Sequence, residues 1–269
     1  MQLKTANRVG SAKAWRAGRT SSTFSLYFDL HQSIRWSSNY YLICQNLNSV
    51  DTFDSINQEV TVCERCPRLR EWCLKVASEK RKSFADDTYW GLPVPNFGDP
   101  NAKGLIVGLA PAAHGANRTG RVFTGDRSGD WLYRALFRAE LANQPTSEHI
   151  NDGLELHGAY VSMIAHCAPP DNKPLPEEIL NCRPYLQRIL QQREWNTILC
   201  LGSIAWNEVF SQLSVKPRPK FSHGAAVQKE KQLILASYHP SQQNTFTGRL
   251  TEEMLDEVVQ KFAEAIRAR

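Results

Sequence analysis

Residues 104–126 read GLIVGLAPAAHGANRTGRVFTGD, an apolar hexapeptide followed by a loop rich in glycine and other small residues. The hexapeptide, residues 104–109, is short, rich in branched apolar side chains and followed by turn residues, a pattern that predicts a buried strand. Three later segments share these properties: residues 158–164 (GAYVSMI), 197–201 (TILCL) and 232–237 (QLILAS). The sequence therefore predicts four buried strands.

Amphipathic segments lie between and after these strands, at about residues 129–142, 176–193, 203–213 and 250–268. Strands that alternate with helices predict an α/β fold in which a parallel sheet is covered by helices on both faces. Ligands of such sheets bind beyond the carboxyl ends of the strands. We therefore expect the chemistry in the loops that follow residues 109, 164, 201 and 237.

The composition is that of a soluble globular chain, with 42% hydrophobic and 22% charged residues among 269. No run of eighteen apolar residues occurs, so we expect no membrane span. The formal net charge of +5 favours a polyanionic partner but decides little alone. The size and charge are compatible with a monomer, which we expect.

The first 50 residues differ from the rest. Between Met1 and Phe28 the chain has five basic residues and no acidic one, and it is rich in serine and threonine. Such a start is typical of an organelle transit peptide, of a disordered leader or of a wrongly chosen start codon. We therefore expect a leader over residues 1–50 and a single domain over 51–269. A prokaryotic chain would act in the cytoplasm at the nucleoid, and a transit peptide would direct it to an organelle.

Seven cysteines in a chain without a clear secretory signal indicate metal binding or buried thiols more than disulfides. Cys63 and Cys66 form a CxxC pair followed by proline, and Cys167 and Cys182 lie fifteen positions apart in a distant segment. On spacing alone these four suit an iron–sulfur cluster or zinc equally, and Cys167 and Cys182 can also be core thiols. Cys44, Cys73 and Cys200 fit no pairing: Cys200 lies in a predicted strand, and Cys73 has no standard ligand spacing.

The loop after the first strand has the residues of a ligand site. Its glycines allow a close backbone approach, and Phe123 stands among polar neighbours, suited to stacking on a flat ring. Three arginines are candidates for phosphate contacts: Arg118, Arg121 and Arg127. Asp126 and Ser128 precede a predicted helix and are either helix caps or catalytic groups.

The loop after the last strand reads YHPSQQN, residues 238–244. His239 stands at the carboxyl end of the strand and is followed by a proline, so it is well placed to touch a ligand. Ser241 and Asn244 are natural donors to phosphate oxygens.

Together these segments resemble the uracil-DNA glycosylase superfamily, specifically its family five, the iron–sulfur type with an apolar first motif. The resemblance covers residues 58–265 and rests on these motifs: GLAP (108–111), GANRTGR (115–121), FTGD (123–126) and His239-Pro-Ser241 with Asn244. It implies a three-layer α/β/α sandwich on a four-stranded parallel sheet. It also implies a structural [4Fe–4S] cluster on Cys63, Cys66, Cys167 and Cys182.

The resemblance further implies hydrolysis of the N-glycosidic bond of uracil, and often of hypoxanthine or xanthine, in double-stranded DNA. The target base is flipped into a pocket because it cannot be reached inside the stack. His239 would donate a hydrogen bond to the departing base, and Phe123 would stack on it. The pocket would be lined by Gly108, Leu109, Ala110 and Pro111, and phosphates would be held by Ser241, Asn244 and Arg249.

Two positions depart from related branches. Leu109 and Ala110 stand where those branches place a water-activating group, so the next polar candidate is Asn117, which orients water but cannot take its proton. Met163 stands near a position where related branches have an asparagine that reads uracil, and an apolar wall there weakens discrimination between bases.

The sequence leaves rival interpretations open. Since no lysine stands at a motif position to form a Schiff base, we expect a monofunctional glycosylase without strand cleavage. The missing acid favours a non-catalytic damaged-DNA-binding protein on the same fold, whereas the His239 motif argues against it. A zinc-bound module is a third reading, which the alternation of strands and helices between the cysteines disfavours.

Overall fold

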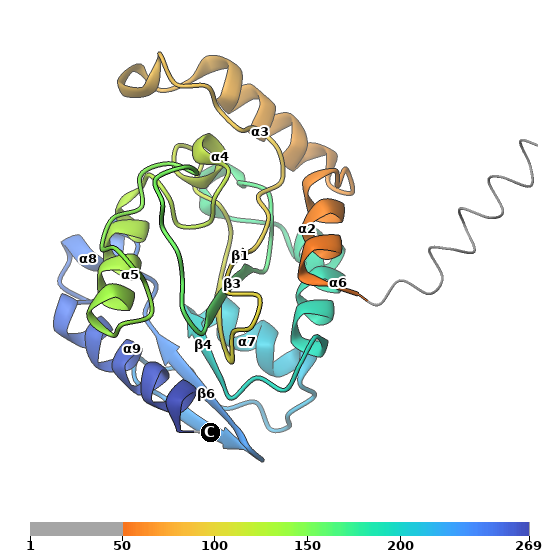
Figure 1. Ribbon diagram of the computed structural model, residues 1–269. Helices are drawn as coiled ribbons and strands as arrows, with labels where there is room; N and C mark the ends of the chain where they lie inside the picture. Colours follow the sequence, from red (N-terminus) through yellow and green to blue (C-terminus); the bar gives the residue numbers. More distant parts are fainter. Residues whose placement is uncertain (1–50, 269) are drawn as a thin grey trace, which may run out of the picture. The chain divides into compact units, whose positions relative to one another are not determined.

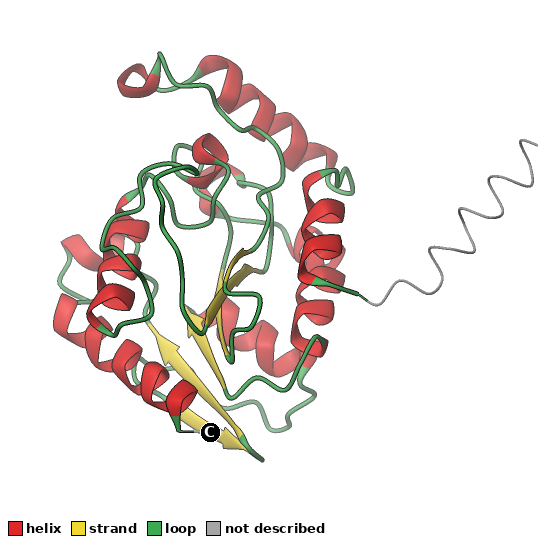
Figure 2. Cartoon of the chain, viewed as in Figure 1, coloured by secondary structure: helices red, strands yellow, loops and turns green. Residues whose placement is uncertain are grey.

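The computed structural model describes residues 51–268, and the leader expected over residues 1–50 lies outside them. Its strands, yellow in Figure 2, form one sheet. The strand order of that sheet is β1-β3-β2-β4-β6-β5. The four central strands run parallel: β2 (Gly104–Gly108), β3 (Ala159–Met163), β4 (Thr197–Leu201) and β6 (Gln232–Ser237). All four strands predicted from the sequence are thereby confirmed.

The prediction of a sheet with only four strands is wrong, because each edge carries one more strand in the antiparallel direction. These are β1 (Phe97–Gly98), which pairs with β3, and β5 (Ala226–Lys229), which pairs with β6. β1 has only two residues, and no residue of β5 is fully buried. Edge strands of this kind lack the continuous apolar run that marks a strand covered on both faces.

Helices cover both faces of the sheet (Figure 1). Their bounds are α2 (Phe53–Thr61), α3 (Pro67–Glu79), α4 (Ala116–Thr119), α5 (Arg127–Arg138), α6 (Pro176–Gln191), α7 (Ser203–Gln212), α8 (Gln242–Phe246) and α9 (Glu252–Arg267), with 3-10 turns at Lys82–Phe84 and Pro170–Asn172. The predicted helix over 129–142 begins earlier and ends earlier than expected, since Asp126 caps its first turn and Glu140 follows it in the left-handed region.

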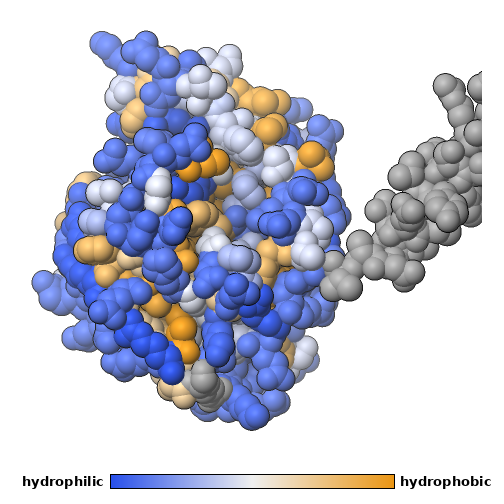
Figure 3. Space-filling view, in the orientation of Figure 1, coloured by the Kyte–Doolittle hydropathy of each residue, from blue (hydrophilic) through white to orange (hydrophobic). Residues whose placement is uncertain are grey.

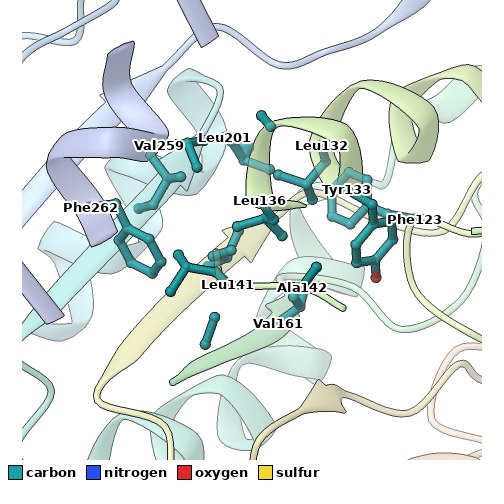
Figure 4. Packing of buried hydrophobic residues seen from close by; sticks show 14 of the residues in the cluster. Phe123, Leu132, Tyr133, Leu136, Leu141, Ala142, Val161, Leu201, Val259 and Phe262 are labelled. Atoms are coloured by element: carbon teal, nitrogen blue, oxygen red, sulfur yellow. The ribbon is translucent and has the colours of Figure 1, made fainter. Parts of the chain in front are cut away.

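Two apolar cores lie on opposite faces of the sheet because successive strand residues point to opposite sides. Ile106 and Leu199 face the core formed with α5 and α9. Leu105 and Ile198 face the core formed with α2, α6 and α7. Figure 4 shows Leu136 and Phe262 gathered with their neighbours in the first of these cores. The expected three-layer α/β/α sandwich is therefore the observed architecture.

The visible face of the molecule is largely hydrophilic, with apolar side chains scattered between polar ones (Figure 3). No helix within residues 51–268 is long and apolar enough to cross a membrane. The largest exposed apolar side chains include Phe246 of α8, which is 68% exposed.

Candidate active site

The loops after β2 and β6 meet beyond the carboxyl ends of the parallel strands, where the sequence placed the chemistry. The ring centroids of Phe123 and His239 lie 5.9 Å apart, with an angle of 32° between the planes. Gly108, the last residue of β2, lies beneath the ring of Phe123, and a Cβ there would stand only 2.8 Å from it. The structure thus brings Gly108, Phe123 and His239 into one site.

Phe123 is held in an unusual backbone conformation, with φ at 50°. Left-handed backbone costs a non-glycine residue roughly 1 kcal/mol or more, so the surroundings must impose it. Gly129 of α5 packs directly against the carbonyl of Phe123, and any Cβ at Gly129 would overlap that oxygen. The Tyr133 hydroxyl donates to the carbonyl of Val122 at 2.9 Å. The start of α5 therefore fixes the ring that faces His239.

His239 is half-buried, and burial lowers the pKa of its imidazole to about 4. The imidazole is therefore neutral at physiological pH and donates through one ring N–H without carrying a charge. Asn244 supports it from α8, since its Nδ2 donates to the carbonyl of His239 at 2.9 Å. Ser241 caps α8 through its hydroxyl, which accepts from the amide of Asn244 at 3.4 Å.

Asp126 is the acidic residue nearest in sequence to Phe123. Its Oδ1 accepts from the amide of Gly129 at 3.0 Å, so it caps α5 as the sequence allowed. Burial raises the pKa of this carboxyl. Its Oδ2 lies against Gly115, where a Cβ would overlap it. The glycine motif therefore makes room for a desolvated carboxylate, the state in which an acid becomes a better base.

Arg118 and Arg121 do not face outward as predicted phosphate contacts. Arg118 donates to Asp87 at 2.6 Å and to the carbonyls of His114 and Gly125, with only 12% of its side chain exposed. The Arg121 side chain is 4% exposed and pairs with Asp152 at 2.6 Å. Both guanidinium groups are satisfied inside the protein, and they stabilise the loop rather than reach for DNA.

Arg121 also donates to the hydroxyls of Thr124 and Ser147. Although burial acts to raise the pKa of the Asp152 carboxyl, the hydrogen bond from Arg121 holds it well below its usual value. This pair therefore stays charged in the folded protein.

Asn117 lies in the core, and no part of it is exposed. Its Nδ2 donates to the carbonyls of Cys73 and Ala113, at 3.3 and 3.4 Å. The amide nitrogen thus links α3 to the loop before α4, while Oδ1 has no hydrogen-bond partner among the described residues, so the predicted role in positioning water stays a prediction.

The remaining pocket residues are apolar. Leu109 and Ala110 are half-buried, Pro111 is buried, and Met163 at the end of β3 is 1% exposed. Met163 belongs to the same apolar core as Phe123. Met163 therefore places an apolar thioether side chain beside Gly108, and not a polar amide.

The segment after His239 carries exposed groups. Arg249 is exposed, and its guanidinium lies 4.6 Å from the ring of Tyr238. Arg127 donates to the hydroxyl of Thr245 at 3.1 Å and lies over the ring of Phe246. The sequence reasoning missed Phe246, although it is the only large apolar side chain between Pro240 and Leu250.

A hollow of about 690 Å³ lies beside Asp126 and Arg127. It shares Asp126 and Arg127 with the surroundings of the site, but neither Phe123 nor His239 lines it. Asp87, Asp130 and Glu148 give it a carboxylate-rich wall, which is unsuited to a DNA backbone. This hollow is therefore distinct from the region around Phe123 and His239.

Four cysteines predicted as ligands line one cavity with His166 and Tyr185. Cys63 follows α2, Cys66 precedes α3, Cys167 follows β3 and Cys182 lies in α6. The amide of His166 donates to the Cys182 sulfur at 3.4 Å, and Asn181 donates to the Cys66 sulfur at 3.6 Å. Burial raises the pKa of Cys182 to about 12. Among the residues described, no three His, Cys, Asp or Glu side chains are arranged as ligands of one metal ion.

Cys73, which the spacing argument set aside, lies against this group. It is fully buried, packs in one cluster with Cys167 and donates to the carbonyl of Ala168 at 3.5 Å. Cys200 is buried in the core under α6 and α7, as its place in a strand predicted. Cys73 lies one helical turn beyond Leu69, on the buried side of α3. This helical periodicity could have predicted that Cys73 is buried, whereas the spacing between the cysteines could not.

Comparison with known proteins agrees with this geometry. The family model of the Uracil DNA glycosylase superfamily matches residues 95–263. The chain is 48% identical over 213 residues to a type-5 uracil-DNA glycosylase of Mycobacterium leprae, which covers 76% of this chain and 91% of the relative. It is 45% identical over 205 residues to the type-5 enzyme of Thermus thermophilus, covering 75% of this chain and 93% of the relative.

A type-4 uracil-DNA glycosylase of Sulfurisphaera tokodaii is more distant, at 26% identity over 202 residues, 71% of this chain and 76% of the relative. The chain therefore belongs to the uracil DNA glycosylase superfamily, and within it to the type-5 branch. The resemblance read from the motifs is confirmed.

Proposed function

We propose that the chain is a monofunctional DNA-repair glycosylase that hydrolyses the N-glycosidic bond of uracil, and also of hypoxanthine and xanthine, in double-stranded DNA. The observation that carries the proposal is the aromatic ring of Phe123 facing the neutral imidazole of His239 at 5.9 Å. One group stacks on a flat base and the other donates to its polar edge. The type-5 relatives support uracil as a substrate.

His239 acts on the leaving group. As the bond between C1′ of the sugar and the base nitrogen breaks, the electron pair stays with the base, and negative charge develops on its oxygens. A ring N–H of His239 donates a hydrogen bond to that oxygen. Because the imidazole is neutral, it stabilises the anion through the hydrogen bond and not through a net positive charge. A preorganised donor of this kind contributes about 3–4 kcal/mol.

Asp126 serves the water. The oxygen of a water molecule bonds to C1′ of the sugar, and the proton it loses passes to the Asp126 carboxylate. The raised pKa of that carboxyl makes it a stronger base than an exposed aspartate. Asp126 is favoured over Asn117 for this role because an amide cannot accept the proton, and because Asn117 is fully buried.

The apolar pocket wall suits a broad substrate range. Met163 and Leu109 offer no donor or acceptor in place of a base-reading amide. Such a wall discriminates weakly between bases that differ in their polar edges, because no buried polar group is left unpaired by the wrong base. This supports hypoxanthine and xanthine beside uracil.

The DNA is held by the segment that follows His239. Arg249 is exposed and contacts a phosphate, and Ser241 and Asn244 hold the segment in shape through the α8 cap and the His239 carbonyl. Phe246, 68% exposed at the end of α8, enters the space left by the flipped base. An apolar wedge in the stack repays part of the cost of unstacking.

The chemistry of the four cysteines supports a [4Fe–4S] cluster, although the described side chains are not arranged around one metal ion. Four thiols line a single cavity, and cysteine thiolates are the usual ligands of such clusters. Cys63, Cys66, Cys167 and Cys182 would hold it, and when bound it supplies a covalent cross-link between α2, α3, β3 and α6. Metal analysis and the absorption near about 400 nm distinguish iron from zinc, since zinc thiolates do not absorb there.

The proposal is tested with duplexes that contain one uracil, hypoxanthine or xanthine, followed by alkali to reveal abasic sites. We expect release from all three and no strand cleavage before the alkali. Release of uracil alone would restrict the substrate range. No release from any duplex, with binding retained, would favour a damaged-DNA-binding protein on the same fold.

A further inference from the structure

His223 lies in the segment that leads into β5 and runs beside the end of β6. The amide of Gly224 donates to the carbonyl of Ala236 at 2.8 Å, and the amide of Ala236 donates to the carbonyl of Ala225 at 2.9 Å. The edge hairpin that the sequence did not predict therefore carries His223 to the carboxyl end of β6, next to the residues that precede His239.

Both ring nitrogens of His223 are engaged. Nδ1 accepts from the backbone N–H of Tyr238 at 3.2 Å, and Nε2 donates to the carbonyl of Met254 in α9 at 3.2 Å. These partners require the neutral ring with its proton on Nε2. Burial lowers the pKa of His223, and the Glu257 and Lys261 side chains of α9 act on it in opposite directions. The ring thus joins three segments: the edge hairpin, the end of β6 and α9.

The side chain of Tyr238 is held by the same ring. The His223 and Tyr238 rings lie 5.2 Å apart at 36°, Phe221 lies 6.0 Å from the tyrosine, and the Arg249 guanidinium lies 4.6 Å from it. Beyond Tyr238, the carbonyl of His239 accepts from Asn244. The backbone that carries His239 is therefore fixed on one side by His223 and on the other by Asn244.

We propose that His223 is a positioning residue of the active site: its Nδ1 fixes the backbone amide of Tyr238 and thereby the direction in which the side chain of His239 points. His223 touches neither the base nor the sugar. The inference rests on the role proposed for His239. Loss of His223 should slow the chemical step, because a His239 donor misplaced by about 1 Å loses much of its contribution to that step.

Two amide substitutions separate the two hydrogen bonds of His223. In His223→Asn, Oδ1 stands two bonds from Cβ, as Nδ1 does, so the acceptor for Tyr238 is kept and the donor to Met254 is lost. In His223→Gln, Nε2 stands three bonds from Cβ, as the histidine Nε2 does, so the donor to Met254 is kept and the acceptor is lost. A matched control is Thr251→Ala, which removes the side-chain cap of α9 without touching Tyr238.

The measurement is the single-turnover rate of uracil release, alongside the Kd for the duplex and the free energy of unfolding. We expect His223→Gln and His223→Ala to slow release about 10- to 100-fold with Kd nearly unchanged. His223→Asn should keep most of the rate, and Thr251→Ala should lose stability without losing rate. Equal rates for the Asn and Gln variants, or rate losses that follow stability in all four proteins, would overturn the proposal.

A double variant keeps the two proposals apart. If His239 acts as proposed, His239→Ala is slow, and adding His223→Gln to it causes little further loss because the donor being aimed is already absent. A fast His239→Ala variant would refute the role of His239. A slow His239→Ala with an unaffected His223→Gln would refute only the positioning role of His223.

Discussion

The two loops that meet at the site differ in how their polar groups are used. In the loop of residues 108–126, Arg118 and Arg121 are bound to carboxylates and carbonyls of the protein, and the chain is fixed around Phe123 and Asp126. In the segment 239–249, Phe246 and Arg249 are exposed. The polar groups of the first loop are bound inside the protein around Phe123 and Asp126, whereas the second segment exposes side chains that we propose contact DNA. Charge in a loop therefore does not by itself indicate a DNA contact.

The strongest way to break the rigid loop is Gly129→Ala, because the new methyl group overlaps the carbonyl of Phe123. We expect uracil release to fall at least about 100-fold and stability to fall by roughly 2–4 kcal/mol. Single-turnover kinetics and denaturant unfolding measure both. Asp130→Ala, one residue further and exposed, is the control and should change neither much. If Gly129→Ala is active and fully stable, the backbone at Phe123 can shift to make room for the methyl group, and the loop is not rigid.

Asp126→Asn tests chemistry inside the rigid loop without disturbing its frame. Asparagine caps a helix as well as aspartate, so unfolding should change by less than about 0.5 kcal/mol. The amide cannot accept the proton of water, so release should slow about 100-fold. Asp130→Asn removes an equal charge from the same helix turn and serves as the control. If Asp126→Asn releases the base as fast as the wild type, Asp126 acts only as the helix cap and not as the base that accepts the proton.

The arginines sharpen the comparison between the loops. Arg121→Ala leaves Asp152 buried and unpaired, which costs about 3–5 kcal/mol of stability. The salt dependence of duplex binding should stay unchanged in this variant. Arg249→Ala should leave stability within about 0.5 kcal/mol and lower the slope of log K against log salt by about one. A reduced salt dependence in Arg121→Ala, or a large loss of stability in Arg249→Ala, would contradict this difference between the two loops.

The smallest effect concerns the charge on His239. Its pKa is about 4 in the folded protein, against about 6.5 for a free histidine, so the unfolded chain binds more protons between these values. Stability therefore falls as the pH drops from about 6.5 to 4. In His239→Asn this loss should be smaller by about 1–2 kcal/mol, allowing for the partial exposure of the ring. Urea unfolding at pH 7 and 4.5 gives the difference, and identical losses would mean that the imidazole is not buried neutral.

The sequence predicted the parts of the fold that depend on local patterns. The four central strands are continuous apolar runs, and the site loops follow them as parallel topology requires. β1 and β5 were not predicted because short or half-exposed edge strands have no such apolar run. The cap of α5 was one of two alternatives left open for Asp126, whereas the cap of α8 was missed because Ser241 was predicted only as a donor to phosphate.

Contacts between residues far apart in the chain could not be predicted from the sequence. Arg121 pairs with Asp152, 31 positions away, and nothing in the motif separates that arginine from an exposed one. His223 meets Tyr238 only because an unpredicted hairpin returns beside β6. Cys73 touches Cys167 across 94 positions, as α3 packs against the loop after β3. Burial of a charge or thiol depends on tertiary contacts that periodicity does not encode.

The donor to the departing base, His239, is the central group of the proposed mechanism. The direct measurement is single-turnover release of uracil from a duplex, at saturating enzyme, by the wild type and by His239→Ala. We expect the variant to be slower by about 100- to 1000-fold, with the Kd for the duplex unchanged. Release by His239→Ala at the wild-type rate would contradict the account.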